Sequence, residues 1–171
     1  MIKTNTFQNI LILITVFAFF TACNQEEKQQ QKYQNQIGDT PYNFNLDTKN
    51  FKLCDSLNTL HKRAYVKYKG GNKALKKELV ENYKLQSQYK TYNGYFIIRF
   101  VVNCKDEAGR YRMEVLDENF NLANAPKELQ KHILNLFKTL KNWQHPFYEN
   151  KHYDGYKFIT IKITNGQIQL V

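Results

Sequence analysis

Residues 95–103 read YFIIRFVVN, an almost continuous apolar run that is rich in β-branched and aromatic side chains. Such a run is typical of a central strand covered on both faces, because a strand with one wet face alternates polar and apolar residues. The polar segment 105–109 (KDEAG) is predicted to form a turn, and the alternating residues 110–116 to return as an antiparallel partner. The chain is therefore expected to fold around a β-hairpin.

One amphipathic helix is expected before this hairpin and one after it. Residues 64–69 (AYVKYK) alternate as a half-buried strand does, a Gly-Gly pair ends that strand, and Asn72 is expected to cap a helix that ends near Lys84. Pro126 is expected at the first position of the second helix. The apolar stripe of the first helix comprises Ala74, Leu75, Leu79, Val80 and Tyr83, and that of the second comprises Leu129, Ile133, Leu134, Phe137 and Leu140.

A long strand and a short one are expected at the end of the chain. Residues 156–164 (YKFITIKIT) have the composition of a strand, and Asn165-Gly166 is the signal of a type I′ hairpin turn. Residues 167–171 can then pair back as a short edge strand. These elements predict an α+β fold, in which an antiparallel sheet of about three to four strands packs against two helices.

The N-terminal segment has the pattern of an export signal. The apolar run at 10–20 (ILILITVFAFF) has 11 residues, fewer than the ~20 that a membrane-spanning helix needs. Two small residues, Thr21 and Ala22, precede Cys23 and resemble the lipobox of bacterial lipoproteins. That resemblance implies cleavage before Cys23, a diacylglyceryl group on its thiol and a membrane anchor, so that residues 1–22 form the signal peptide. The alternatives are cleavage elsewhere or a retained anchor, with Cys23 an ordinary thiol.

A polar tether is expected between the lipidated cysteine and the folded domain. Residues 23–45 are rich in Gln and Asn and hold almost no aliphatic side chains, so they cannot build a core, and the domain is expected at 46–171. By resemblance to known sorting signals, Asn24 directs the protein to the outer membrane, because it is not the aspartate that retains lipoproteins in the inner membrane. Glu26 and Glu27 resemble the short acidic signals of surface lipoproteins. Both the periplasmic face and the cell surface therefore remain open.

The chain is strongly basic. It has 25 Lys and Arg against 15 Asp and Glu, a net charge of +10. Removal of residues 1–22 takes away only Lys3 and leaves +9. Since an exported protein meets little nucleic acid, that partner is not expected. Anionic lipid head groups, acidic glycans and acidic segments of partner proteins are the expected counter-surfaces.

The two remaining cysteines are an even number in an exported chain. Cys54 and Cys104 are therefore expected to form a disulfide, the alternative being two buried free thiols. Their spacing fits no zinc site and contains no CxxC. No metal or other cofactor is therefore expected.

Sequence patterns for catalysis are weak. Ser56 and Ser87, the serines of the mature chain, lie outside any nucleophile-elbow pattern, and the chain has no HExxH, P-loop or GxGxxG motif. His145 and His152 flank an aromatic loop at 143–153, which suits either a packed loop or a site for a sugar or a metal. The chain is therefore not expected to be an enzyme.

The order and spacing of these elements resemble the C-terminal domain of TonB-like proteins over residues 65–171. The chain departs from that family where Trp-x-Pro is usual, because two residues separate Trp143 from Pro146, and near Lys151, where the family usually has Gly. The matching pieces are the Gly-Gly-x-x-Ala-Leu motif at 70–75, the strand 94–103 with its Phe-Val-Val-Asn ending, the return strand 111–116, the helix 126–140 and the strand 157–163.

The resemblance implies a binding module. In this family a sheet edge accepts a short strand from a receptor, with backbone hydrogen bonds giving affinity and side-chain pockets giving selectivity. The membrane helix and Pro-rich arm with which TonB proteins transmit energy have no counterpart here, so energy transduction is not expected. The candidate edges are 157–163 and 167–171. The candidate partner-binding residues are Lys157, Ile159, Ile161 and Ile163, with Arg99, Arg110 and Arg112 as anchors for acidic groups.

Three functions follow from these features. The first is a lipid-anchored accessory module of the cell envelope that binds an outer-membrane receptor or another envelope protein by strand pairing. The second is a structural subunit or homodimer that uses the same edges. The third is a surface ligand binder that uses the aromatic loop 143–153. The alternative to the first function is that Arg99 only covers apolar surface and that the C-terminal tail covers the sheet edge, so that no partner binds there.

Overall fold

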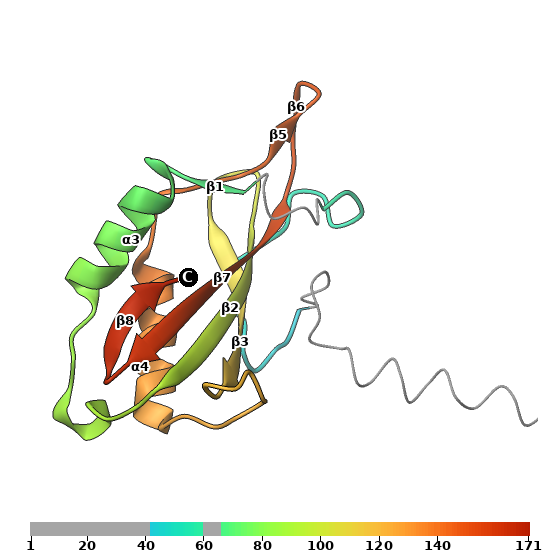
Figure 1. Ribbon diagram of the computed structural model, residues 1–171. Coiled ribbons are helices and arrows are strands. Elements are labelled where there is room, and N and C mark those ends of the chain that lie inside the picture. Colours follow the sequence, from blue (N-terminus) through green and yellow to red (C-terminus); the bar gives the residue numbers. More distant parts are fainter. Residues whose placement is uncertain (1–41, 60–65) are drawn as a thin grey trace, which may run out of the picture. The chain divides into compact units, whose positions relative to one another are not determined.

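The computed structural model describes residues 42–59 and 66–171 (Figure 1). These residues belong to one compact unit, Thr40–Val171. The unit includes residues 42–45, which the sequence assigns to the tether. The expected signal peptide 1–22, the lipidation site Cys23 and the rest of the tether lie outside the described residues.

A four-stranded antiparallel sheet forms the centre of the unit (Figure 1). Its strands are β2 (Gly94–Val102), β3 (Ala108–Leu116), β7 (Gly155–Thr164) and β8 (Gln167–Leu170), in the spatial order β3-β2-β7-β8. Strand β2 pairs antiparallel with both β3 and β7, which confirms it as a central strand. The predicted α+β class is confirmed.

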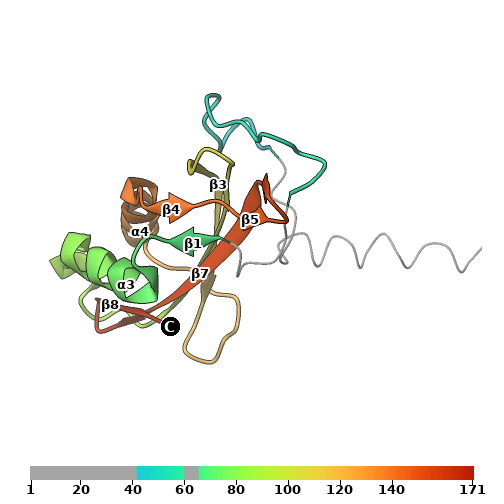
Figure 2. The same ribbon diagram turned by 90° about the horizontal axis from the view of Figure 1, so that it is seen from above.

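Two α-helices lie on the same side of this sheet (Figure 2). They are α3 (Gly71–Asn82) and α4 (Lys127–Thr139), and a short 3₁₀ helix, η3 (Ser87–Tyr89), follows α3. Two smaller two-stranded sheets complete the described part of the chain. One pairs β1 (Lys67–Tyr68) with β4 (Trp143–Gln144), and the other pairs β5 (Phe147–Tyr148) with β6 (Lys151–His152).

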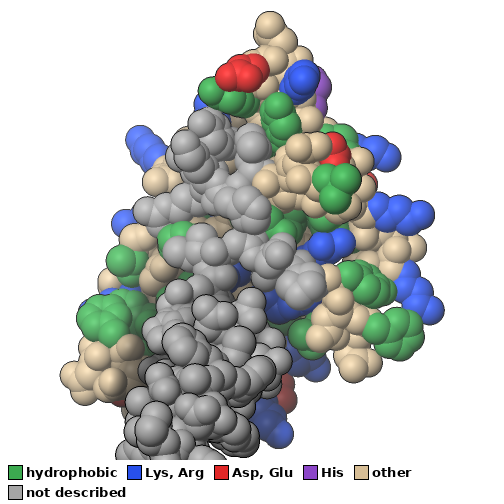
Figure 3. Space-filling view, turned by 90° about the vertical axis from the view of Figure 1, so that its right-hand side faces the viewer, with side chains coloured by type: hydrophobic (Ala, Val, Ile, Leu, Met, Phe, Trp, Pro, Cys, Tyr) green, Lys and Arg blue, Asp and Glu red, His purple; other side chains and the backbone are tan. Residues whose placement is uncertain are grey.

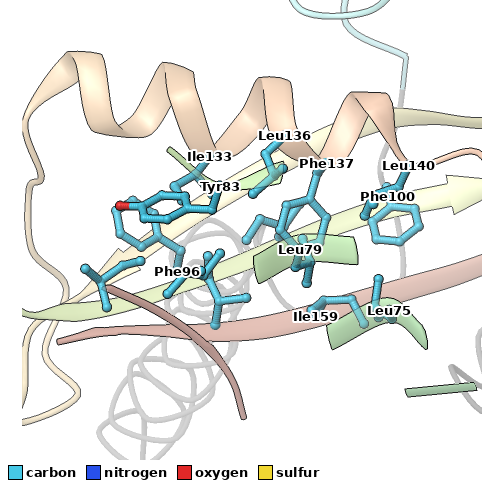
Figure 4. Close-up of a cluster of buried hydrophobic side chains, with 14 of the residues drawn as sticks. Leu75, Leu79, Tyr83, Phe96, Phe100, Ile133, Leu136, Phe137, Leu140 and Ile159 are labelled. Carbon is cyan, nitrogen blue, oxygen red and sulfur yellow. The ribbon is translucent and has the colours of Figure 1, made fainter. Parts of the chain in front are cut away.

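The hydrophobic core lies between the helices and one face of the sheet (Figure 4). Alternate side chains of β2 point to the helices and are fully buried, and on β7 their partners Ile161 and Ile159 are buried as well. Helix α4 contributes one apolar stripe and α3 a second. The buried residues are Phe96, Ile98, Phe100, Ile161 and Ile163 from the sheet, Leu75 and Leu79 from α3, and Leu129, Ile133, Leu136 and Phe137 from α4.

The second face of β2 is only partly covered, which corrects the expectation of a strand covered on both faces. Tyr95, Ile97 and Arg99 alternate with the core residues and are half-buried. The ring of Phe120 stacks on Tyr95 with 4.7 Å between centroids, and Glu114 pairs with Arg99. The helices cover only one face of β2, and these contacts shield part of the other face. The apolar side chains of residues 95–103 are therefore tolerated on both faces.

Both helices begin differently from the prediction. Gly70, in the left-handed region at φ 83°, is the N-cap of α3, and Asn72 lies in the first turn with no capping role. Helix α3 also faces the core with Leu75 and Leu79, which leaves Val80, predicted in the apolar stripe, 49% exposed. Pro126 is the N-cap of α4 and not its first helical residue.

Leu134 of α4 is half-buried, and the buried residue that the predicted stripe omits is Leu136. A helix of 3.6 residues per turn allows several neighbouring stripes, and contact with the sheet selects one of them.

One strand expectation is confirmed in part and a second is wrong. The strand expected at 64–69 is, within the described residues, the two-residue β1, and it pairs with β4 and not with the main sheet. Strand β7 is not an edge, because it lies between β2 and β8. The edge role falls to β8 at the C-terminal end, and the type I′ turn is confirmed by the positive φ angles of Asn165 (48°) and Gly166 (73°).

Candidate functional site

Strand β8 forms one edge of the main sheet, and its outward backbone groups define the first candidate site. The turn makes Thr164 and Gln167 a hydrogen-bonded pair, so hydrogen bonding to β7 alternates along β8. The Val171 N–H donates to the Thr160 carbonyl at 3.1 Å, in agreement with this phase. The N–H and C=O groups of Ile168 and Leu170 therefore point away from β7, and no strand of the described chain pairs with them.

The residues of β8 lack most of the features that protect a sheet edge. Its four residues, Gln167 to Leu170, contain no charge and no proline, and the pairing with β7 has no bulge. Natural proteins block edges with lysines, prolines, bulges or very short strands. In β8 the short length applies, and helix α3 lies beside Ile168, which is 7% exposed, so a second extended chain can reach the edge mainly at the half-buried Leu170.

The opposite edge, β3, carries several such protective features. Two residues of β3, Arg110 and Tyr111, face the single residue Phe100 of β2 in a β-bulge. The Tyr111 carbonyl accepts a hydrogen bond from its neighbour's side chain, Arg112 Nη1, at 2.9 Å. Near the end of the strand, the Val115 carbonyl accepts the Ala123 N–H at 3.0 Å. The edge of β3 is therefore already partly occupied by the chain itself.

The arginines predicted as anchors already have partners within the chain. Arg99 pairs with Glu114 at 2.7 Å, and Arg112 holds both carboxylate oxygens of Asp47, at 2.7 and 2.9 Å. Burial alone would raise the pKa of Asp47, but its hydrogen bonds to Arg112 and the Asn43 N–H, with the positive charge of Arg112, lower it overall. The bidentate geometry strengthens the Arg112 pair, and the side chains of both Arg112 and Arg99 serve the fold.

The remaining predicted partner residues do not form an exposed surface. Ile161 and Ile163 are fully buried and Ile159 is 8% exposed, all three in the core. Lys157 Nζ donates to the Val66 carbonyl at 2.8 Å. Arg110 is half-buried at the bulge, with φ 54°. The strand that carries these residues was predicted as an edge, and its interior position explains their burial.

The predicted disulfide between Cys54 and Cys104 is present. Beside it lies the buried carboxylate of Asp154, which accepts backbone N–H groups from Cys54 at 2.7 Å, Asp55 at 2.9 Å and Cys104 at 3.0 Å. The two sulfurs and this carboxylate lie within 4.8 Å of one another. Since the sulfurs are bonded to each other and the carboxylate binds three N–H groups, this cluster is a structural lock.

The aromatic loop is a projecting hairpin, β5–β6, at the top of Figure 1. Its rings do not form a closed packed loop, because Phe147 is 57% and Tyr148 45% exposed. At its base, His145 Nε2 lies 2.5 Å from His152 Nδ1, and His145 Nδ1 lies 2.6 Å from Asp106 Oδ1. The hairpin therefore brings together two histidines that are seven positions apart in the sequence.

Sequence reasoning named both histidines but missed their contact and missed Asp106. A two-residue turn at Glu149-Asn150 pairs Phe147 with His152, which places His145 diagonally opposite on the same face. A hairpin centred on Glu149-Asn150, had it been predicted from the sequence, would have brought the two histidines together. Nothing local in the sequence indicates Asp106, because it comes from the β2–β3 turn.

The surface is basic as predicted. Figure 3 shows Lys and Arg side chains along one side of the unit, interleaved with hydrophobic ones and with few acidic ones, and histidine near the projecting tip. Among the described residues, the helices are too short or too polar to span a bilayer.

Comparison of the chain with protein-family models, with curated proteins and with solved structures finds no match. The fold and its edge define the class of protein, an α+β unit with one open strand edge. The TonB-like resemblance stays an expectation from the sequence.

Proposed function

We propose that this protein is a lipid-anchored, non-enzymatic accessory module of the bacterial cell envelope that binds an extended peptide segment at the edge of β8. The observation that carries the proposal is the outward backbone of Ile168 and Leu170 on an uncharged edge strand. A peptide that pairs there adds a fifth strand and gains backbone hydrogen bonds. The partner class is an extended segment of an outer-membrane receptor or another envelope protein.

The geometry sets a modest affinity. Two outward residues on β8 offer at most four backbone hydrogen bonds, and each contributes about 0.5–1.5 kcal/mol net. Side chains of the added strand alternate between the helix side, near the partly buried Leu170, and the open face of the sheet, near Gln169. Anchoring both molecules in one membrane raises their effective concentration, so weak pairing suffices.

The lipid anchor rests on the pattern that ends at Cys23 and is tested separately. We expect the native chain to start at Cys23, to carry a mass increase of two or three acyl chains and to partition with membranes. A Cys23→Ser variant is expected to keep its signal peptide and lose the acyl mass. An unmodified thiol at Cys23 in the native protein would show that the anchor is wrong without bearing on the β8 edge.

Strand pairing is tested with short random peptides displayed on phage and selected against the full chain. We expect selected peptides to bind the wild type and Leu170→Ala equally well. Leu170→Pro removes one outward N–H donor and leaves the bonds to β7 intact, and it is expected to weaken binding at least tenfold. A proline at Ile161 is unsuitable, because that residue lies inside the sheet.

Hydrogen exchange gives a second readout of the same site. The amide of the half-buried Leu170 is expected to exchange quickly in the free protein and slowly with a bound peptide. Absence of any selected peptide, or equal binding by Leu170→Pro and Leu170→Ala, contradicts the proposal.

A homodimer through the same edge is the second candidate, because an uncharged strand can pair with its own copy. Analytical ultracentrifugation separates the two functions. A dimer that Leu170→Pro dissociates supports self-pairing, whereas a monomer that binds peptide supports the accessory module.

A further inference from the structure

The pair formed by His145 and His152 has a feature that the proposed function does not use: two ring nitrogens face each other across 2.5 Å. The atoms are Nε2 of His145 and Nδ1 of His152. The other ring nitrogen of His145, Nδ1, lies 2.6 Å from Asp106 Oδ1. Three separate parts of the chain thus converge, namely the β2–β3 turn, the two-residue link between β4 and β5, and β6.

The hydrogen positions in this chain of groups follow from the chemistry of the carboxylate. An ionised Asp106 can only accept a hydrogen bond, so His145 Nδ1 must carry the proton. In its neutral form His145 then has a lone pair on Nε2, directed at His152. Neutral His152 meets it with an N–H on Nδ1. Neutral His152 can also carry its proton on Nε2. In that tautomer His145 Nε2 and His152 Nδ1 each present a lone pair, and no proton has to leave the protein.

Contacts within the chain hold the His145 ring in place before anything binds. Asp106 Oδ1 accepts the His145 backbone N–H at 2.7 Å as well as the ring N–H, which fixes the orientation of His145. The hairpin ladder continues to the base, where the Tyr153 N–H donates to the Pro146 carbonyl at 3.0 Å. The Phe147 ring packs against His152 with 4.8 Å between centroids.

Solvent access differs between the two rings. The His145 side chain is 17% exposed, and His152 lies at the surface. Metal–nitrogen bonds of ~2.0–2.1 Å require the two nitrogens to lie about 3 Å apart, so the surface ring of His152 turns outward slightly and admits the ion from its side.

We propose that His145 Nε2 and His152 Nδ1 bind a divalent transition-metal ion of the class that prefers imidazole, such as Zn²⁺, Cu²⁺ or Ni²⁺. Asp106 acts as a positioning residue, because a carboxylate that accepts the second ring N–H of a ligating histidine fixes its tautomer and raises its basicity. Two protein ligands leave the other coordination positions to water or to a donor from a bound molecule.

The metal site is independent of strand pairing at β8. That pairing uses backbone groups of the last strand of the main sheet, whereas the metal site uses side chains of the β5–β6 hairpin and the β2–β3 turn. It also goes beyond the aromatic-loop ligand site, because the two histidines and Asp106, and not the exposed aromatic rings, form the site.

The test uses the full chain and the metal ions alone as probes. Isothermal titration with Zn²⁺ is expected to show one equivalent that is lost in the double variant His145→Ala/His152→Ala, which reports background binding by the rest of the chain. Asp106→Asn is expected to weaken binding about 10–100-fold, the usual effect of removing such a carboxylate. Gln144→Ala, an exposed neighbour on β4, is the matched control and should bind as the wild type does.

Spectroscopy of the unmodified chain covers the case in which a variant disturbs the hairpin. With one equivalent of Cu²⁺, pulsed electron paramagnetic resonance is expected to show two coordinated imidazoles. The proposal is wrong if the wild type binds no more metal than the double variant, or if the copper spectrum shows no imidazole nitrogens. In that result the pair is a hydrogen-bonded latch that closes the hairpin.

Discussion

Removing the Cys54–Cys104 disulfide is expected to cost the protein about 4 kcal/mol of unfolding free energy. The two cysteines are 50 positions apart. A cross-link over about 50 residues lowers the entropy of the unfolded chain by about 14 cal/mol/K, which gives the ~4 kcal/mol at 25 °C. Since small domains have a total stability of about 5–15 kcal/mol, this is a large share.

The structure makes the entropic term easy to isolate. Cys54 is exposed and Cys104 is half-buried, so replacing both with serine leaves no large cavity. The assay is urea unfolding of the full chain, wild type against Cys54→Ser/Cys104→Ser. We also expect a larger slope with denaturant in the variant, because an unfolded chain without the cross-link exposes more surface. By the average unfolding entropy per residue, the melting temperature falls by about 15 °C for a unit of this size.

Reductant provides the internal control. It is expected to lower the stability of the wild type to the level of the variant and to leave the variant unchanged. A loss below about 1 kcal/mol, or an unchanged denaturant slope, would refute the reasoning, since it would mean that segment 42–59 stays near Cys104 in the unfolded chain without the bond.

Three further predictions concern the folded unit. Asp154→Ala removes the acceptor of three backbone N–H groups, and we expect a loss of at least about 3 kcal/mol in denaturant unfolding. Gly109→Ala places a Cβ 2.3 Å from the Phe51 ring, so we expect a loss of about 1–3 kcal/mol and faster proteolysis within 42–59. Burial lowers the pKa of His132 below 6.5, so stability should be full above that pH and fall as the pH drops through the folded pKa. His132→Gln should remove that decline in thermal unfolding between pH 7 and pH 5, with Tyr89, whose hydroxyl contacts the ring, kept in both proteins.

Periodicity predicted the parts of the fold that local patterns determine. The run 95–103, the type I′ turn and the stripe through Leu129, Ile133 and Phe137 each carry their own signal, and the structure contains all three. The sequence could not predict the order of strands, because pairing partners are set by contacts between distant segments. That is why β7 was still a candidate edge: its hairpin with β8 follows from the turn, whereas its pairing with the distant β2 does not.

The candidate sites divide in the same way. The disulfide followed from a count of cysteines and the edge from a turn signal, whereas Asp154 and Asp106 each act on groups far away in the sequence. Asp154 binds N–H groups 99, 100 and 50 positions away, and Asp106 binds His145 39 positions away. No local pattern distinguishes these two carboxylates from the other acidic residues of the chain. A similar limit applies to Arg112, whose partner Asp47 lies 65 positions away.

The placement of these contacts explains why one sheet edge is closed and the other open. The segment that follows the tether is bound to β3 in two ways, Asp47 to Arg112 and Phe51 against Gly109, and to the turn before β3 by the disulfide at Cys104. Strand β3 is the first in the sheet order and β8 the last. The described segment 42–59 therefore occupies the β3 side of the sheet. A peptide paired with β8 meets neither that segment nor its ion pair, so the two edges can act independently.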